Sequence, residues 1–476
     1  MLFRSGIASN TTVNSGGELI VSSGGESISA QLLSGTAGFG NELVSSGGSA
    51  LNTLVTNGAR QTVFTGGTTI STLVSATGFT STTSAVETLS GGTASNTSVV
   101  GTGKLVVSSG GVASNATASN NIFGSGDGGV FVSSGGTASA TTILSGGLQV
   151  VFASGVASGT LLSAGGAEVV SSGGVDSGAV IVGSANLVVS AGGSAVGTTD
   201  SGTLFMPNGP GLTLSSGGFS LSAAINSGGS EFVHVNAIAS DTILSGGGGM
   251  IVWSGGSALN TTAATNGSAG VGGVSVTSGG SALSTVVESG GRQIVSAGGF
   301  ASGTTIQSGG LQIVSGPGGE FVRSGPSDVV VSVSVGVGGT AIGTIVQSGG
   351  TEQVGGTESG ALVSGSLIVS SGGVLSNGSA LSGGQITVST GGATISTVLA
   401  GSAASGLVAV EFLSSGGTAT STIVSTGASL IVGSGGSTTS TTLSAGGFLD
   451  VHSGGVASNT LVSGGATATV SVTDST

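Results

Sequence analysis

The residues in this sequence that could act as a general acid and base are few and scattered. The 476 residues include 18 Asp and Glu, and the aspartates lie far apart. Cleavage of a glycosidic bond needs two carboxyl groups that flank the bond together. Glu352 and Glu358 are near each other in sequence, but nothing around them marks them as such a pair. We interpret the carboxylates as solvated surface charges and predict no catalytic residue.

The two histidines, His234 and His452, stand in stretches that alternate apolar and polar residues. Asp450 precedes His452 by two positions, so both side chains point to one face of a strand. Neither histidine has another ligand at the spacing of a metal site, and no GxSxG elbow with a following helix offers a nucleophile for a triad. We expect structural or solvent-facing histidines, with no metal and no cofactor.

Two glycine-rich ligand motifs are incomplete here. Lys104 lies in VVGTGKLV, which resembles a phosphate-binding loop, but Ser98 occupies the place of the first glycine and Leu105 replaces the residue that would bind Mg²⁺. The calcium-binding repeat GGxGxD requires an aspartate in each turn, which these repeats lack. We therefore predict neither a nucleotide nor a calcium site.

Composition excludes several classes of protein. The chain is 37% hydrophobic and only 5% charged, which disfavours disorder, and its 100 glycines follow no period of three, which excludes collagen. No apolar run reaches the roughly 18 residues of a membrane-spanning helix. The net charge of −13 disfavours nucleic acid and anionic lipid as partners. Cysteine is absent, so disulfides and thiolate sites are excluded.

Glycine doublets recur along the chain at a fixed alternation. In one stretch they begin at Gly279, Gly290, Gly298 and Gly309, so that a longer step alternates with a shorter one. One repeat is therefore about 19 residues long, and the length of the chain allows about 25 copies. Between the doublets apolar and small polar residues alternate, which indicates strands, while the doublets suit corners because glycine adopts positive φ readily.

A short strand, a glycine corner, a second short strand and a second corner describe one coil of a parallel β-helix, or solenoid. We predict an all-β fold with Val and Ile ladders inside and Ser and Thr ladders outside. Residues 1–476 are expected to form a single solenoid domain. Three irregular stretches near 118–129, 200–211 and 316–339 break the register, and prolines such as Pro207 and Pro326 indicate that they leave the sheets as insertions.

The repeat SGGxASxTxVxSGGxxxVxSGG resembles the AIDA-type repeat of autotransporter adhesins, the passenger domains that mediate diffuse adherence and self-aggregation in Gram-negative bacteria. The resemblance covers nearly the whole chain and implies a right-handed parallel β-helix at the cell surface. It also implies heptose on corner serines, added by a dedicated glycosyltransferase. The matching acceptor positions are Ser278, Ser289, Ser308 and Ser453, whereas Ala164, Ala297 and Ala445 replace serine in other copies.

Two features of that family are missing from the sequence, namely a signal peptide and the carboxy-terminal translocator barrel. We expect a non-enzymatic adhesin stalk, surface-displayed or secreted, that holds cells to one another or to host-cell receptors. Two alternatives stay open at this point: a β-helical polysaccharide-active enzyme, and a passive spacer whose neighbouring domain does the binding.

Overall fold

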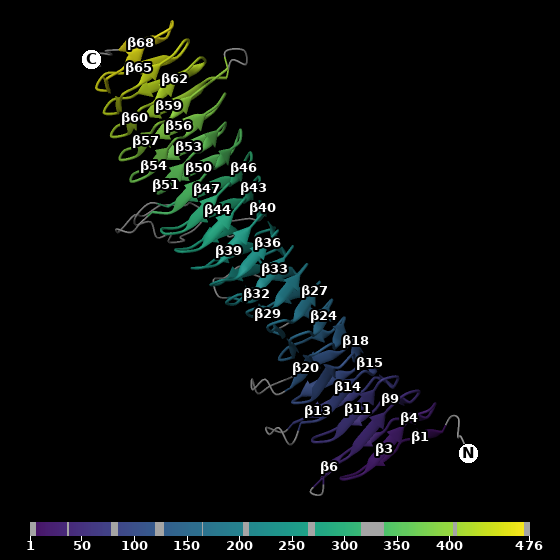
Figure 1. Cartoon of the computed structure of the whole chain (residues 1–476). Helices are drawn as coiled ribbons and strands as arrows, with labels where there is room; N and C mark the ends of the chain where they lie inside the picture. The colour runs from purple at the N-terminus through teal and green to yellow at the C-terminus, as the bar shows by residue number, and fades with distance from the viewer. Residues whose placement is uncertain are drawn as a thin grey trace. The chain divides into compact units, whose positions relative to one another are not determined.

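The computed structural model describes residues 6–35, 38–77, 84–119, 128–163, 165–202, 209–264, 272–315, 338–402 and 407–470. Every regular element in these ranges is a β-strand, so they contain no helix of the length and apolarity that a membrane span requires. The strands belong to two compact units, Met1–Ala239 and Ser240–Thr476. Figure 1 shows that short strands are stacked in successive layers within each unit.

Each coil contains three strands. In the second unit one coil consists of β45 (Phe300–Ser302), β46 (Thr305–Ile306) and β47 (Leu311–Val314). These strands belong to three parallel sheets, which we call sheets A, B and C in that order. The prediction of a parallel β-solenoid with coils of the repeat length is confirmed. The prediction of two strands in a coil is wrong, because the longer piece of the repeat bends once more and holds two of them.

The corners are made in two different ways. At a glycine doublet the first residue, such as Gly309, has a φ of 77°. The second, Gly310, has no room for a side chain, since a Cβ there would lie 2.5 Å from the carbonyl oxygen of Val287. The third corner, between sheets A and B, needs only one left-handed residue, such as Gly303 with φ 66° or Ser284 with φ 57°. Asn and Ser serve there as well as Gly, so the glycine pattern did not reveal this corner.

Parallel backbone hydrogen bonds join each coil to the next at a fixed register. Arg292 lies beside Leu311 in sheet C, one repeat later. Some coils contain additional residues, yet their strands still pair with the preceding strand of the same sheet. The first paired residues in three such coils are Lys104 with Gly129, Asn186 with Gly211, and Leu311 with Thr351. Extra residues between two coils therefore leave the alignment of the sheets intact.

The predicted irregular stretches lie mainly outside the described residues, as do three of their four prolines; Pro210 is described, directly before β32 (Gly211–Leu214). Strands stand at several of the described ends. Ala118 belongs to β19 (Thr117–Ser119), Gly129 opens β20 (Gly129–Val132), and Asp200 lies in β31 (Thr199–Gly202). Each sheet thus continues up to the point where the chain departs from the regular repeat.

Five positions of each coil point inward. In the coil of β45–β47 they are Ala301, Thr304, Ile306, Gln312 and Val314, all buried. The threonine of the repeat therefore lies inside, and the prediction that threonine ladders face outward is wrong at this position. Its buried equivalents are Thr53, Thr72, Thr97, Thr141, Thr160, Thr198, Thr242, Thr261, Thr285, Thr344, Thr397, Thr422 and Thr441. The interior consequently combines Val, Leu, Ile and Ala with a column of hydroxyl groups.

Candidate functional site

The four predicted acceptor serines lie at glycine-doublet corners, and all four are exposed. Ser289 and Ser308 follow sheet B in successive coils, where the amide of Gly290 donates to the carbonyl of Gly309 over 3.0 Å. Ser278 and Ser453 stand at the other doublet corner, after sheet C. Serines at one corner therefore form a column along the outside of a unit, interrupted in coils where alanine replaces serine.

The alanines that replace serine at the corners differ in exposure. Ala445 is exposed and Ala297 is half-buried, while Ala164 is outside the described residues. The carbonyl of Ala445 accepts a hydrogen bond of 2.5 Å from the Thr426 hydroxyl of the preceding coil. A hydroxyl at this corner position can thus bind the coil that follows it, and it can also face solvent.

The carboxyl groups are found mostly inside the coils. The interpretation of the acidic residues as solvated charges is wrong for nine of them, each with 0% of its surface exposed: Glu42, Glu87, Glu168, Asp176, Asp200, Glu231, Glu352, Glu358 and Glu411. Glu352 and Glu358, the pair considered in the sequence, are among these. Neither can reach a polysaccharide in solution, so the pair offers no support for the glycosidase alternative.

Most of the buried glutamates share one position, the second residue of a sheet C strand or, as for Glu411 in β59 (Ala409–Leu413), the residue that pairs with it in the next strand. We call this position the interior column. In some coils it holds Glu or Gln, and in others Leu, Val, Ile or Met. Glu168 in β26 (Ala167–Val170) follows Gln149 in β23 (Leu148–Val151), and the Gln149 amide donates to Glu168 over 2.9 Å. The same amide donates to the hydroxyl of Thr160 over 2.9 Å. Polar residues of the interior column therefore bind each other and the buried threonines.

Where the interior column holds a carboxyl, the residue at the centre of the facing sheet A strand also differs from the usual one. The central residue of sheet A strands is alanine in most coils: Ala50, Ala94, Ala113, Ala138, Ala157, Ala195, Ala239, Ala258, Ala282, Ala301, Ala341 and Ala419. Beside Glu87 it is Thr69, whose hydroxyl donates over 2.7 Å. Beside Glu411 it is Thr394, which donates over 2.6 Å. The sequence thus supplies a donor in the coil where a buried carboxyl needs one.

Two coils pair the interior column with a second carboxyl. Glu168 faces Asp176 of β27 (Val175–Ser177), and Glu352 of β50 (Thr351–Val354) faces Glu358 of β51 (Thr357–Ser359). Burial raises the pKa of Asp176 and of Glu358 to about 7. Burial, and then the charge of the facing carboxylate, raise the pKa of Glu168 and Glu352 well above 4.5. Two like charges in an apolar interior cannot both form, so each pair retains a proton.

Other buried carboxyls stand alone. Burial raises the pKa of Glu87 and Glu411 from 4.5 to about 7, although hydroxyl donors lower it in part. Burial likewise raises the pKa of Asp200 to about 6. The formal charge of −13 therefore overstates the charge on the surface, because nine acidic residues of the described chain are inside. The surface therefore repels anionic partners less strongly than the formal charge implies.

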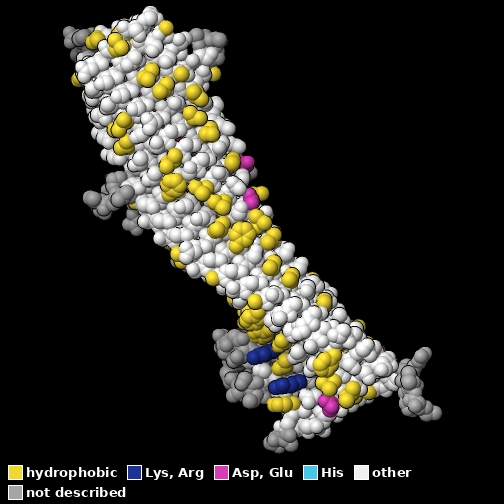
Figure 2. All heavy atoms as spheres, viewed as in Figure 1, with side chains coloured by type: hydrophobic (Ala, Val, Ile, Leu, Met, Phe, Trp, Pro, Cys, Tyr) yellow, Lys and Arg dark blue, Asp and Glu magenta, His cyan; other side chains and the backbone are white. Residues whose placement is uncertain are grey.

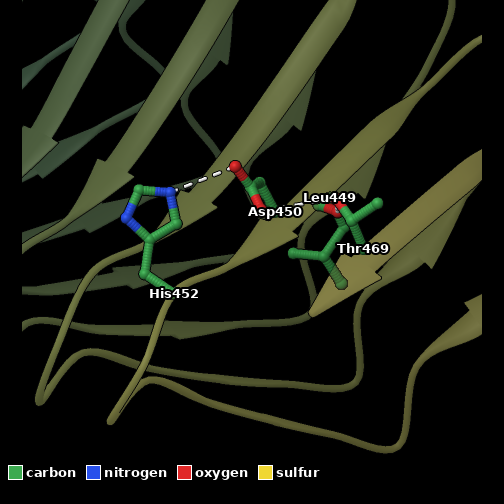
Figure 3. A network of polar contacts seen from close by, with 4 residues as sticks. All are labelled: Leu449, Asp450, His452 and Thr469. Carbon is green, nitrogen blue, oxygen red and sulfur yellow. Dashed lines mark hydrogen bonds and ion pairs between the residues drawn. The ribbon is translucent and has the colours of Figure 1, made fainter. Parts of the chain in front are cut away.

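Asp450 and His452 lie on one face, as predicted. Figure 3 shows His452 Nε2 directed at Asp450 Oδ2, 3.1 Å away, and Thr469 Oγ1 donates to Asp450 Oδ1 over 3.3 Å. His452 is exposed and no nucleophile adjoins it in these contacts. His234 is half-buried just after β35 (Ser230–Val233). The parts of the chain that the structure describes contain no cluster of three or more residues that could hold a metal ion.

Lys104 lies in β17 (Lys104–Ser108) rather than before a helix, and its ammonium group lies 5.8 Å from the centre of the Phe131 ring. Outward positions of sheets A and B also carry apolar residues, for instance Val156 beside Val175 and Leu161 beside Val180. Figure 2 shows such side chains scattered among uncharged polar ones, with few charges. The outer surface is therefore less uniformly hydroxylated than the repeat suggested.

Comparison with known proteins identifies the repeat. Residues 275–320 match the family model AIDA, described as an adhesin of the bacterial autotransporter system and a probable stalk. The predicted resemblance to AIDA-type repeats is confirmed by this match. No curated protein sequence matches the chain.

Two solved structures are similar to the chain. One is a TibC-catalysed, hyper-glycosylated fragment of TibA, with 26% identity, a TM-score of 0.31, and coverage of 80% of this chain and 97% of the fragment. The other is the Dettilon tailspike protein, with 10% identity, a TM-score of 0.12, and coverage of 90% of this chain and 62% of the tailspike.

The interior hydrogen bonds give a matched pair of substitutions at adjacent threonines. Thr304 donates to the Gln293 side-chain oxygen over 2.9 Å, whereas Thr305 faces outward between Val286 and Ile345. Thr304→Val should lower the free energy of unfolding by about 1–3 kcal/mol, because it leaves a buried amide oxygen unpaired. Thr305→Val should change it by less than about 0.5 kcal/mol. Urea unfolding of both variants checks this, and equal effects would contradict the assigned faces.

Proposed function

We propose that this chain is the non-enzymatic stalk of a bacterial adhesin, displayed on or secreted from a Gram-negative cell. The observation that carries the proposal is the match of residues 275–320 to an autotransporter stalk family. Three of the exposed corner serines, Ser278, Ser289 and Ser308, lie within that segment. The repeat that identifies the family is thus also the one that places hydroxyls at the surface.

Adhesion by such a surface rests on repetition. Coils about 4.8 Å apart present equivalent side chains in columns, so many weak contacts can act together and replace one tight site. The burial of nine acidic residues of the described chain leaves fewer charges outside to repel a second copy of the chain. We propose receptors on host cells, or identical molecules on other bacteria, as the partners.

We further propose that the exposed corner serines accept O-linked sugar from a glycosyltransferase. Ser278, Ser289, Ser308 and Ser453 are accessible on the folded chain, and they stand on tight turns of nearly constant shape. A single enzyme site could therefore recognise every one of them. The buried repeat threonine, by contrast, is closed to any enzyme once the coil has folded.

Adhesion is tested by displaying the whole chain on a non-adherent bacterium through an unrelated outer-membrane anchor. Displaying cells should clump, or bind cultured host cells, at least several-fold more than cells that carry the anchor alone, because the columns of the solenoid supply multivalent contacts. Sedimentation and plate counts measure this. If display at equal surface density leaves both readouts unchanged, the chain is a passive spacer and the adhesin proposal fails.

Glycosylation is tested by mass spectrometry of the chain produced with an autotransporter glycosyltransferase. Peptides with Ser278, Ser289 and Ser308 should gain sugar masses, and Ser→Ala changes at these three positions should remove them. Ser302→Ala is the control, because Ser302 is half-buried on the outer face of β45 and stands at no glycine doublet. Sugar on Ser302 but none on the corner serines would contradict the assignment.

A further inference from the structure

We propose that the solenoid takes up protons as it folds, through carboxyl groups buried inside the coils, so that mildly acidic solution holds the coils closed and alkaline solution opens them. The sites are two single glutamates, Glu87 and Glu411, and the two facing pairs. This inference concerns the interior and is independent of the proposed adhesion.

Among the described residues, none around Glu411 could neutralise a carboxylate. Glu411 lies in β59 (Ala409–Leu413), between Ile386 of the preceding coil and Leu430 of the following one. From the other two sides of the coil, the groups that act on its pKa are the hydroxyls of Thr394 and Thr422. With two apolar neighbours and no cation, the protonated form is the one that the closed coil accommodates.

Glu87 has similar surroundings in the first unit. It lies in β14 (Val86–Ser90), with Gln61 on one side and Leu105 on the other. Hydroxyls from other strands and corners of the coil surround its carboxyl group. Within the described part of the chain, the one titratable group that acts on it is Glu42, in the interior column beyond Gln61, and its charge also disfavours ionisation.

In the facing pair of the second unit, the only titratable group of the described chain that acts on Glu352 is Glu358, and the reverse also holds. The neighbours of Glu352 along the interior column are Gln312 and Leu367. The Thr344 hydroxyl donates to Glu358 over 3.2 Å. A bound proton therefore takes the place of a cation in this pair.

The facing pair of the first unit has the same construction. Glu168 lies between Gln149 and Leu187 in the interior column. Asp176 lies between two alanines of sheet A, in β24 (Val156–Ser158) and β30 (Ser194–Val196). Each unit thus contains one facing pair and one single glutamate with a strongly raised pKa. Among the described residues, no Lys or Arg is one of the groups that act on the pKa of these carboxyls.

The direction of the pH effect follows from these values. Folding raises the pKa of Glu411 from 4.5 to about 7. Stabilisation by its proton is complete below 4.5 and is lost as the pH rises through about 7, because the unfolded chain releases the proton more readily. A rise of this size lowers the folding equilibrium constant by up to about 300-fold for one group. Glu87 adds a loss of the same order.

The chain itself supplies the conservative variant. Glutamine already occupies the interior column at Gln149, Gln293 and Gln312, so a neutral amide of the same shape fits there. Glu411→Gln removes the titration of one site while keeping the packing. Glu18→Gln is the matched control, because Glu18 is an exposed residue of β3 (Glu18–Val21).

The test is urea unfolding of the full chain at pH 5 and pH 8.5. The wild type and Glu18→Gln should unfold at markedly lower urea concentration at pH 8.5, and Glu411→Gln should show a clearly smaller drop. A drop that is absent, or that is the same in both variants, would overturn the proposal.

A second measurement needs no variant. In isoelectric focusing, the native chain should have an isoelectric point above the value of about 4.1 that its sequence gives. Denaturation in urea should lower the isoelectric point toward that value. If the native and denatured chains have the same isoelectric point, folding takes up no protons. That result would also overturn the proposal.

Discussion

The structure depends on one constraint, the parallel pairing of each strand with its equivalent in the next repeat. Backbone hydrogen bonds fix this register, and a shift by a single position would turn every inward side chain outward. A residue therefore has two permanent neighbours, the equivalent residues of the coils before and after it. Ile294 stacks on Ile313, and Gln293 stacks on Gln312, in the same pair of strands. Columns of like residues are the direct result.

That constraint explains how polar groups persist inside so narrow a structure. Burial of a carboxyl or amide costs least where hydrogen-bond partners surround it. The repeat threonine supplies a hydroxyl in many coils, and sheet A replaces alanine by Thr69, Ser220 or Thr394 opposite a glutamate. Where the replacement is itself acidic, as at Asp176 or Glu358, a proton takes the place of a donor. Surface chemistry and interior chemistry are thus set by different positions of the same repeat.

Much of this architecture could be predicted from sequence, because glycine doublets mark two corners by a requirement that few other residues meet. Gly310 has no space for a Cβ, so the doublet recurs wherever that corner recurs. The third corner could not be found in this way, since Ser284 and Gly303 both satisfy it. Without that corner, the strand that follows Thr304 could not be oriented, and the threonine was placed outside.

The buried carboxyls were missed for a related reason. The carboxylates were interpreted as solvated charges, whereas Glu352 and Glu358 face each other in the interior from consecutive strands of two sheets. The clue was present in the sequence as a departure from alanine in the ASxT piece, which reads TES around Glu358 and VDS around Asp176. The corner serines were predictable because their exposure follows from the doublet alone.

Disulfide trapping tests the stacking of coils most directly, since the chain has no cysteine of its own. Equivalent residues of adjacent coils lie about 4.8 Å apart, within the range of Cα separations that a disulfide spans. The double variant Ser289→Cys and Ser308→Cys should form an intramolecular disulfide under mild oxidation. The pair Ser278→Cys and Ser289→Cys, at different corners, should not. A disulfide in the second pair and none in the first would contradict the coil-on-coil stacking from which the rest follows.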